Sequence, residues 1–188
     1  MYVVTDDGVI LIDALWDEAQ TQPLLDSIEK RHHQRVKICV ITHFHDDRTA
    51  GLDILKQQGV KTYSYIRSYQ KGMEKGEKTT EFRFTADTSF QLGHIRFEAF
   101  FPGHGHAPDN IVIWFPQAKV LYGGCFIKSM EAETLGNLED ADVASWTLAV
   151  QKVMKKFKSP RYVIPGHQSW TDKNALKHTL QLLTTNGK

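Results

Sequence analysis

Residues 36–48 read VKICVITHFHDDR, and this stretch decides which fold we expect. Its first part, 36–42, is apolar and β-branched on both faces apart from Lys37, which is typical of a strand covered from two sides. Its second part is polar and supplies two histidines and two aspartates directly after the strand. Because α/β folds gather their sites at the carboxyl ends of strands, the stretch predicts an α/β protein with a functional site at 43–47.

Strand-like and helix-like segments alternate on both sides of this stretch. We expect strands at 2–5, 9–13, 36–42, 61–65, 82–85, 88–92, 94–101, 110–115, 119–122 and 162–164, and helices opening at Asp17, around Leu52–Leu55, after residue 66, at 144–157 and at 173–183. An Asp-Gly step at Asp7-Gly8 predicts a hairpin between the first two strands. Two runs of strands flanked by helices predict two mixed sheets packed together, a four-layer αββα sandwich in a single domain over 1–188.

The composition narrows the classes of protein and partner. With 41% hydrophobic and 24% charged residues the chain is an ordinary globular sequence, and its net charge of +1 supplies no reason to expect nucleic acid. The longest apolar run, Ile111–Phe115, is far shorter than the roughly 20 residues that cross a bilayer. The first residues are expected to form a strand rather than a signal peptide. We therefore expect a small-molecule partner, with no nucleic acid and no membrane span.

The first candidate metal ligands are His43, His45 and Asp47. In an extended segment the two imidazoles project to the same side, and the carboxylate joins them as the chain turns. Three such side chains at one strand end are a strong local signal for a metal site. The alternative is a polar loop whose Asp46 or Asp47 caps the next helix, which leaves both histidines without a role.

Three further strand ends carry metal-ligand residue types. His106 lies in a loop rich in Gly and Pro, Cys125 follows Gly123-Gly124, and His167 follows Pro165-Gly166. Taken singly, each is more often structural than catalytic, but their repetition favours six ligands for a pair of zinc ions, with a borderline-soft thiolate among them. His104, two residues before His106, is an equal candidate by spacing alone.

Five motifs in this order resemble one family over essentially the whole chain. They are THFHDDR (42–48), PGHGHAPDN (102–110), GGCFIK (123–128), LGNL (135–138) and PGH (165–167). Together they look like the dizinc subclass of the class B metallo-β-lactamases. The resemblance implies the αββα metallo-β-lactamase fold.

The resemblance also assigns residues to roles. It implies a first zinc on three histidines and a second on an Asp-Cys-His set, which are His43, His45 and His106, and Asp47, Cys125 and His167. The wider superfamily typically has a further histidine straight after this Asp, whereas Arg48 stands here, as expected for the lactamase subclass. Lys128 and Asn137 match positions that the family uses for substrate. From the residues alone, the alternatives are a solvated surface lysine at Lys128 and a turn residue after Gly136 at Asn137.

The resemblance implies hydrolysis of the β-lactam ring of penicillins, cephalosporins and carbapenems by a metal-bound hydroxide, and hence antibiotic resistance. Asp47 would orient the hydroxide, the Asn137 amide would stabilise the oxyanion, and Lys128 would bind the substrate carboxylate. Two alternatives stay open, a hydrolase of the same superfamily that acts on thioesters or lactones, and a truncated zinc-binding form with little activity.

Residues around these motifs receive supporting roles. Adjacency suggests that Arg48 braces the ligands of the second zinc by hydrogen bonding. Asp13, which ends a strand, is similarly expected to anchor the loop at 43–47, here called the metal loop. Cys39 alternates into an apolar strand and is expected to be a small core residue.

Cell location and assembly follow from the family alone. The resemblance implies a secreted or periplasmic enzyme and a monomer. Family members carry further strands and an apolar flap before the point where this sequence begins, so we expect a domain without them. A dimer through the exposed N-terminal edge is the alternative assembly.

Overall fold

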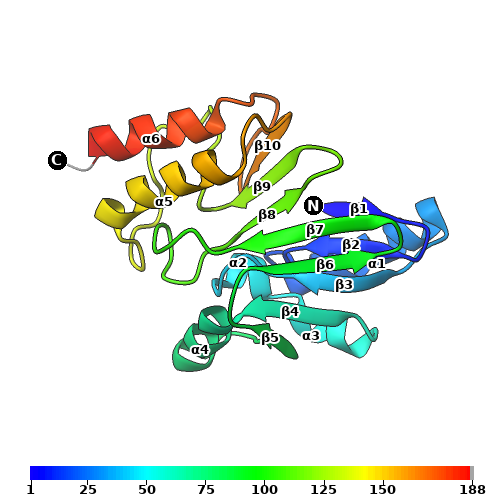
Figure 1. Cartoon of the computed structure of the whole chain (residues 1–188). Coiled ribbons are helices and arrows are strands. Elements are labelled where there is room, and N and C mark those ends of the chain that lie inside the picture. The colour runs from blue at the N-terminus through cyan, green and yellow to red at the C-terminus, as the bar shows by residue number, and fades with distance from the viewer. Residues whose placement is uncertain (187–188) are drawn as a thin grey trace. The chain divides into compact units, whose positions relative to one another are not determined.

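The computed structural model describes residues 1–186 (Figure 1). The chain divides into two compact units, one formed by 1–86 with 90–96 and the other by 87–89 with the residues from 97 onward. The first unit contains one five-stranded mixed sheet, the second contains most of another, and helices pack against each.

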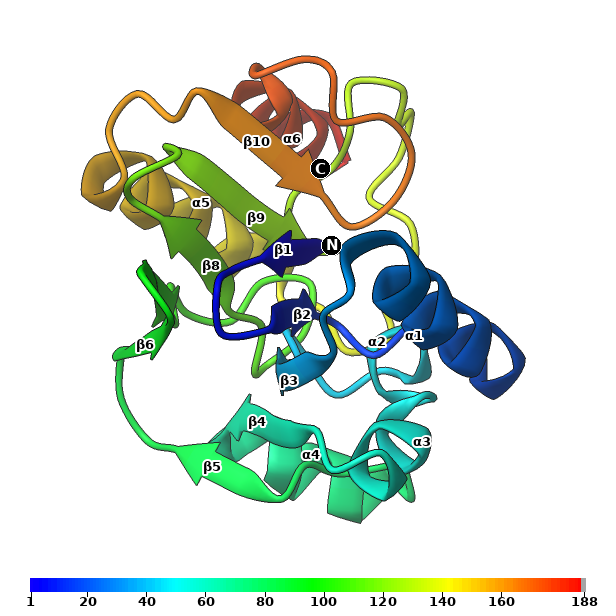
Figure 2. The same cartoon turned by 90° about the vertical axis from the view of Figure 1, so that its right-hand side faces the viewer.

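The first sheet has the strand order β1-β2-β3-β4-β5 (Figure 2). These strands are β1 (Tyr2–Val4), β2 (Val9–Ile12), β3 (Val36–Val40), β4 (Lys61–Tyr65) and β5 (Phe82–Phe84). Strand β1 pairs antiparallel with β2 across the expected turn, and all later pairs are parallel. The carboxyl ends of β2, β3 and β4 therefore lie at one edge of the sheet, where the metal loop begins.

The first unit has four helices, and two of them contribute apolar side chains to its core. The four are α1 (Glu18–His32), α2 (Asp46–Thr49), α3 (Leu52–Gln57) and α4 (Ile66–Lys75). Ile28 of α1 and Leu55 of α3 pack in one core cluster with Leu11 and Cys39. Burial of the Cys39 thiol raises its pKa, so this cysteine is a protonated core residue, as expected.

The second sheet has the order β10-β9-β8-β7-β6. Its strands are β6 (Thr88–Leu92), β7 (Ile95–Phe100), β8 (Val112–Phe115), β9 (Val120–Gly124) and β10 (Tyr162–Pro165), and its helices are α5 (Val143–Lys156) and α6 (Ala175–Asn186). Both helices cover the same face of the sheet, with Trp146 and Leu183 in the core beneath them (Figures 1 and 2). Strand β10 runs parallel to β9, whereas β7, β8 and β9 pair antiparallel.

The predicted elements form close to their expected bounds, with two differences. Strand β5 lies in a run of short strands that continues to residue 123, yet it pairs with β4 in the first sheet because α4 is a crossover that returns the chain beside β4. Helix α1 begins after its Asp17 cap, as expected, and continues through Pro23, a residue that usually disfavours a helix interior. Among residues 1–186 no helix is long and apolar enough to cross a membrane.

Candidate metal centre

The first unit brings together the three donors that follow β3. His43 is 1% exposed, and its ring lies edge-on to that of His45 with 4.6 Å between the ring centroids. The one-turn helix α2 then carries Asp47 back toward His43, so that Asp47 Oδ1 lies 3.7 Å from His43 Nε2. Asp46 is exposed, which favours Asp47 over Asp46 as the carboxylate of the site.

A buried carboxylate behind the loop fixes its start. Asp13 Oδ1 accepts hydrogen bonds from the Thr42 backbone N–H at 2.7 Å and from Thr42 Oγ1 at 2.9 Å. Thr42 Oγ1 also lies 3.4 Å from His43 Nδ1, the nitrogen on the opposite side of the ring from Nε2. Asp13 has a φ of +66°, in the left-handed region that favours glycine, so the backbone is strained where it presents this carboxylate. The expected anchoring role of Asp13 is therefore visible in these contacts.

Arg48 joins the same carboxylate to the candidate ligand Asp47. Its Nη2 lies 3.1 Å from Asp47 Oδ2, and its Nη1 lies 3.6 Å from Asp13 Oδ2. Because the guanidinium faces Oδ2 of Asp47, the other oxygen, Oδ1, is the one that faces His43. This ion pair is the contact that the predicted bracing role of Arg48 requires, and the role itself stays a prediction.

The acidic side chain of Glu77 lies near Asp46 of this loop. Burial raises the pKa of Glu77, and the neighbouring carboxylate of Asp46 raises it further, against a smaller opposing effect of His45.

The second unit brings Cys125 and His167 together through the parallel pairing of β9 and β10. Gly124 at the end of β9 is in register with Pro165 at the end of β10, so the residues that follow leave the sheet at the same edge. Cys125 Sγ lies 3.2 Å from His167 Nε2. Gly124 has a φ of +55°, a conformation that lets the chain turn sharply straight after the strand.

His106 is held by its loop and by an aromatic wall. Asn110 clamps the loop by accepting from the Ala107 N–H at 2.9 Å and donating to the Gly103 carbonyl at 3.0 Å. A Cβ at Gly105 would lie 2.6 Å from Phe126, so only glycine permits this close approach. His106 is 5% exposed, with its ring centroid 5.8 Å from that of Trp146.

The neighbouring histidine has a structural contact instead. His104 Nε2 lies 2.8 Å from the carbonyl oxygen of Asp140, so its ring ties two loops together. This contact favours His106 over His104 as the ligand.

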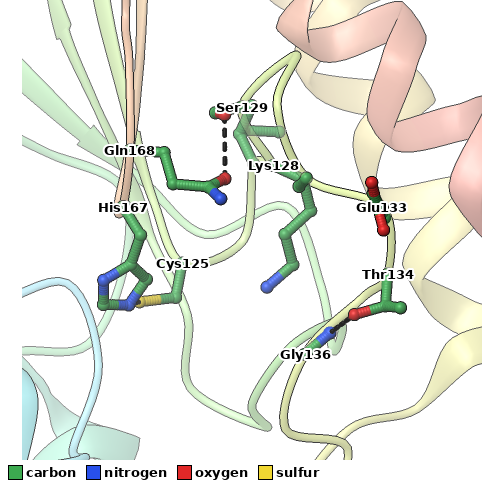
Figure 3. Close-up of a pocket in the computed structure, with 10 residues that line it drawn as sticks. Cys125, Lys128, Ser129, Glu133, Thr134, Gly136, His167 and Gln168 are labelled. Atoms are coloured by element: carbon green, nitrogen blue, oxygen red, sulfur yellow. Dashed lines mark hydrogen bonds between the residues drawn. The ribbon is translucent and has the colours of Figure 1, made fainter.

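A cavity of about 210 Å³ opens beside Cys125 and His167 (Figure 3). Lys128 projects its ammonium into this cavity, and its backbone N–H donates to Thr179 Oγ1 at 2.9 Å. Its Nζ also lies 5.3 Å from the centre of the Trp146 ring. The cavity thus combines a pair of candidate metal ligands with an ammonium group that points into it. This combination suits an anionic ligand.

Asn137 lies outside the lining of this cavity. Its Oδ1 accepts from the Glu139 N–H at 2.9 Å, which is the turn contact expected of an asparagine in a loop. This contact leaves the Nδ2 donor for the oxyanion role, which stays a prediction.

Two residues that line the cavity were not predicted from the sequence. Ser129 and Gln168 line the cavity and are joined by a hydrogen bond of 3.0 Å from Ser129 Oγ to Gln168 Oε1. Gln168 directly follows the predicted ligand His167, and this adjacency was the only sequence signal that pointed to it.

Each unit carries three of the six predicted metal donors. Imidazole, thiolate and carboxylate are the donors that zinc prefers, and the separation of 3.2 Å from Cys125 Sγ to His167 Nε2 is close to the roughly 3.5 Å between neighbouring ligands of a tetrahedral zinc. The donor sets therefore fit zinc.

Comparison with known proteins agrees with this chemistry. The sequence profile of the metallo-beta-lactamase superfamily matches residues 1–167. The chain is 40% identical over 184 residues to a metallo-beta-lactamase type 2 of Elizabethkingia meningoseptica, covering 98% of this chain and 74% of that protein. It is 37% identical to metallo-beta-lactamase IND-1 of Chryseobacterium indologenes, covering 97% of this chain and 77% of that protein.

Solved structures give the same result for the fold. The metallo-beta-lactamase from Pontibacter korlensis superposes with a TM-score of 0.95 at 39% identity, covering 98% of this chain and 86% of that one. Metallo-beta-lactamase IND-7 superposes with a TM-score of 0.94 at 37% identity, covering 98% of this chain and 84% of that one. The expected fold class, the α/β metallo-β-lactamase sandwich, is confirmed, and the chain belongs to the metallo-β-lactamase family.

Proposed function

We propose that this chain hydrolyses the β-lactam ring of penicillins, cephalosporins and carbapenems with two zinc ions and so gives resistance to these antibiotics. Family membership supports the reaction. The observation that carries the assignment to this site is the 3.2 Å approach of Cys125 Sγ to His167 Nε2 beside a cavity that Lys128 enters. A second metal site of this kind belongs to the zinc lactamase subclass that the motifs resemble.

We assign the first zinc to His43, His45 and His106, and the second to a set made of Asp47, Cys125 and His167. Zinc held by these residues would supply an activated water at neutral pH and polarise the lactam carbonyl. The assignment needs the two units to act together as the single domain expected over 1–188.

The protein's own groups would bind and orient the substrate. Lys128 offers its ammonium to the carboxylate that these antibiotics share, which fixes the ring relative to Cys125 and His167. Asn137 would donate its Nδ2–H to the oxyanion that forms at the carbonyl, and Asp47 would hold the attacking water by its Oδ1. Arg48 would keep this carboxylate oriented, because it holds the other oxygen, Oδ2, at 3.1 Å.

We propose that the enzyme acts in the periplasm or outside the cell, and that it is a monomer. Localisation of the tagged full-length protein by cell fractionation, and its mass in solution by light scattering, test these two statements.

The test of the reaction is loss of the β-lactam absorbance of a carbapenem, a cephalosporin and a penicillin on incubation with zinc-loaded protein. We expect turnover that a chelator abolishes and added zinc restores. His167→Ala should lower kcat/KM at least about a hundredfold, because it removes a ligand of the metal that activates the reaction.

His33→Asn is the matched control, since His33 is an exposed histidine at the end of α1 with a φ of +53° that asparagine also adopts. It should behave as the unmodified protein. Turnover of thioesters or lactones without any turnover of β-lactams would refute the proposed reaction.

A further inference from the structure

Gln168 forms part of the cavity wall next to Cys125 and His167 (Figure 3). Its φ is +63°, in the left-handed region that favours glycine. A long polar side chain therefore stands at a position where the backbone conformation disfavours any side chain. Its exposure at the mouth of the cavity makes this side chain available to a ligand.

Ser129 fixes which end of the Gln168 amide faces the cavity. Ser129 is 1% exposed, and its Oγ accepts from the Glu131 N–H at 3.0 Å. Its own proton is donated to Gln168 Oε1 at 3.0 Å. Because the carbonyl end of the amide is held by Ser129, the NH₂ end is turned the other way, toward the space that the Lys128 ammonium also enters (Figure 3).

A carboxylate in this space would need more than one donor. Its two oxygens offer about four acceptor positions, and a single ammonium on a flexible stem cannot occupy them all or fix the plane of the group. An amide held in one orientation by a buried hydroxyl supplies a directed second donor without adding charge. Glu133 lines the cavity on the side of Thr134, away from Gln168, so it does not compete for this donor.

We propose that Gln168 Nε2 donates a hydrogen bond to the substrate carboxylate beside Lys128, and so helps to select substrates with an anionic group at that position. This inference rests on the proposed function, because it names the part of a β-lactam that the cavity binds. Ser129 acts as a positioning residue for the amide.

The kinetic test compares a β-lactam acid with its methyl ester on Gln168→Leu and Gln168→Gly. Loss of one hydrogen bond to a charged group at an exposed site should raise KM for the acid about three- to tenfold, with the ester within about twofold of the unmodified protein. Gln168→Gly relieves the positive φ, so its thermal midpoint should not fall and a weaker acid substrate cannot be ascribed to unfolding.

Gln151→Leu is the matched control, because it makes the same change at an exposed position of α5 outside the cavity. It should leave the KM of both compounds unchanged. An unchanged KM for the acid in the Gln168 variants, or an equal rise for acid and ester, would overturn the inference while leaving β-lactam hydrolysis intact.

A binding measurement separates the two proposals. In ¹⁵N-labelled zinc-loaded protein, the side-chain NH₂ resonances of Gln168, identified by their absence in Gln168→Leu, should shift on titration with the acid and not with the ester. If the unmodified protein hydrolyses neither compound, the proposed function fails, and this titration still decides the inference. Absence of a shift with the acid would refute the contact at Gln168.

Discussion

The guanidinium of Arg48 lies between the carboxylates of Asp13 and Asp47, and the residue is only 8% exposed. Arg48→Ala leaves the buried carboxylate of Asp13 and the partly buried carboxylate of Asp47 without their cation. We expect the free energy of unfolding to fall by about 3 kcal/mol. We also expect the affinity for the second zinc to fall about ten- to a hundredfold, because the bracing contact on Asp47 is lost.

Arg48→Lys is the informative companion variant. Lysine keeps the charge but cannot reach both carboxylates with a planar pair of donors, so its stability should recover more than its zinc affinity. Urea unfolding and a competition titration with a zinc chelator measure the two quantities. Equal zinc affinity in all three proteins would contradict the bracing role of Arg48.

Lys128 is expected to bind the substrate carboxylate through its ammonium. Lys128→Ala should lower kcat/KM for a carboxylate-bearing β-lactam about tenfold to a hundredfold, because a charge-assisted contact is lost. Lys177→Ala removes an equal charge from an exposed position of α6 and should have no such effect. Steady-state kinetics on both variants check the prediction, and similar losses in both would mean that Lys128 acts only through general electrostatics.

Among the elements, helix α5 depends on a titratable cap. The Asp142 carboxylate accepts from the Ser145 N–H at 3.0 Å, and its hydrogen bonding to Ser145 lowers its pKa below the ordinary value of 3.8. A carboxyl group with a lowered pKa in the folded state stabilises the fold above its ordinary pKa, and this contribution is lost as the pH falls through the lowered value. The cap should therefore matter at neutral pH and not in strong acid.

Asp142→Ala should lower the thermal midpoint at about pH 6, and the difference from the unmodified protein should vanish toward about pH 2. Asp142→Asn keeps a capping oxygen that does not titrate, so it should stay close to the unmodified protein at about pH 6. Calorimetry across this range provides the measurement. A constant difference between Asp142→Ala and the unmodified protein at every pH would exclude the ionised cap.

Most helices and strands were predictable from local sequence patterns. Strands such as β3 are short apolar runs ended by polar residues, and helices such as α1 begin at a capping aspartate, so local patterns locate them. The sheet to which β5 belongs was not predictable from its own residues. Its place beside β4 depends on how the α4 crossover packs, which is a property of tertiary structure.

For the molecule as a whole, sequence patterns located the candidate ligands but not their geometry. Cys125 and His167 are 42 positions apart, and their 3.2 Å approach arises because β9 and β10 are parallel neighbours in register. The orientation of Gln168 was equally hidden, since it depends on a hydrogen bond to Ser129, 39 positions earlier in the chain. Motif resemblance could assign roles to the ligands, whereas the side-chain contacts around them needed the structure.

The zinc content of the protein measured together with its carbapenem turnover tests the central claim most directly. Metal analysis of the protein after zinc loading and desalting should find two zinc ions per chain, and one in Cys125→Ala, with carbapenem hydrolysis that disappears on chelation and returns with zinc. Two bound zinc ions without ring opening would support the assigned metal ligands and contradict the enzymatic function. No bound zinc at all would contradict the metal centre itself.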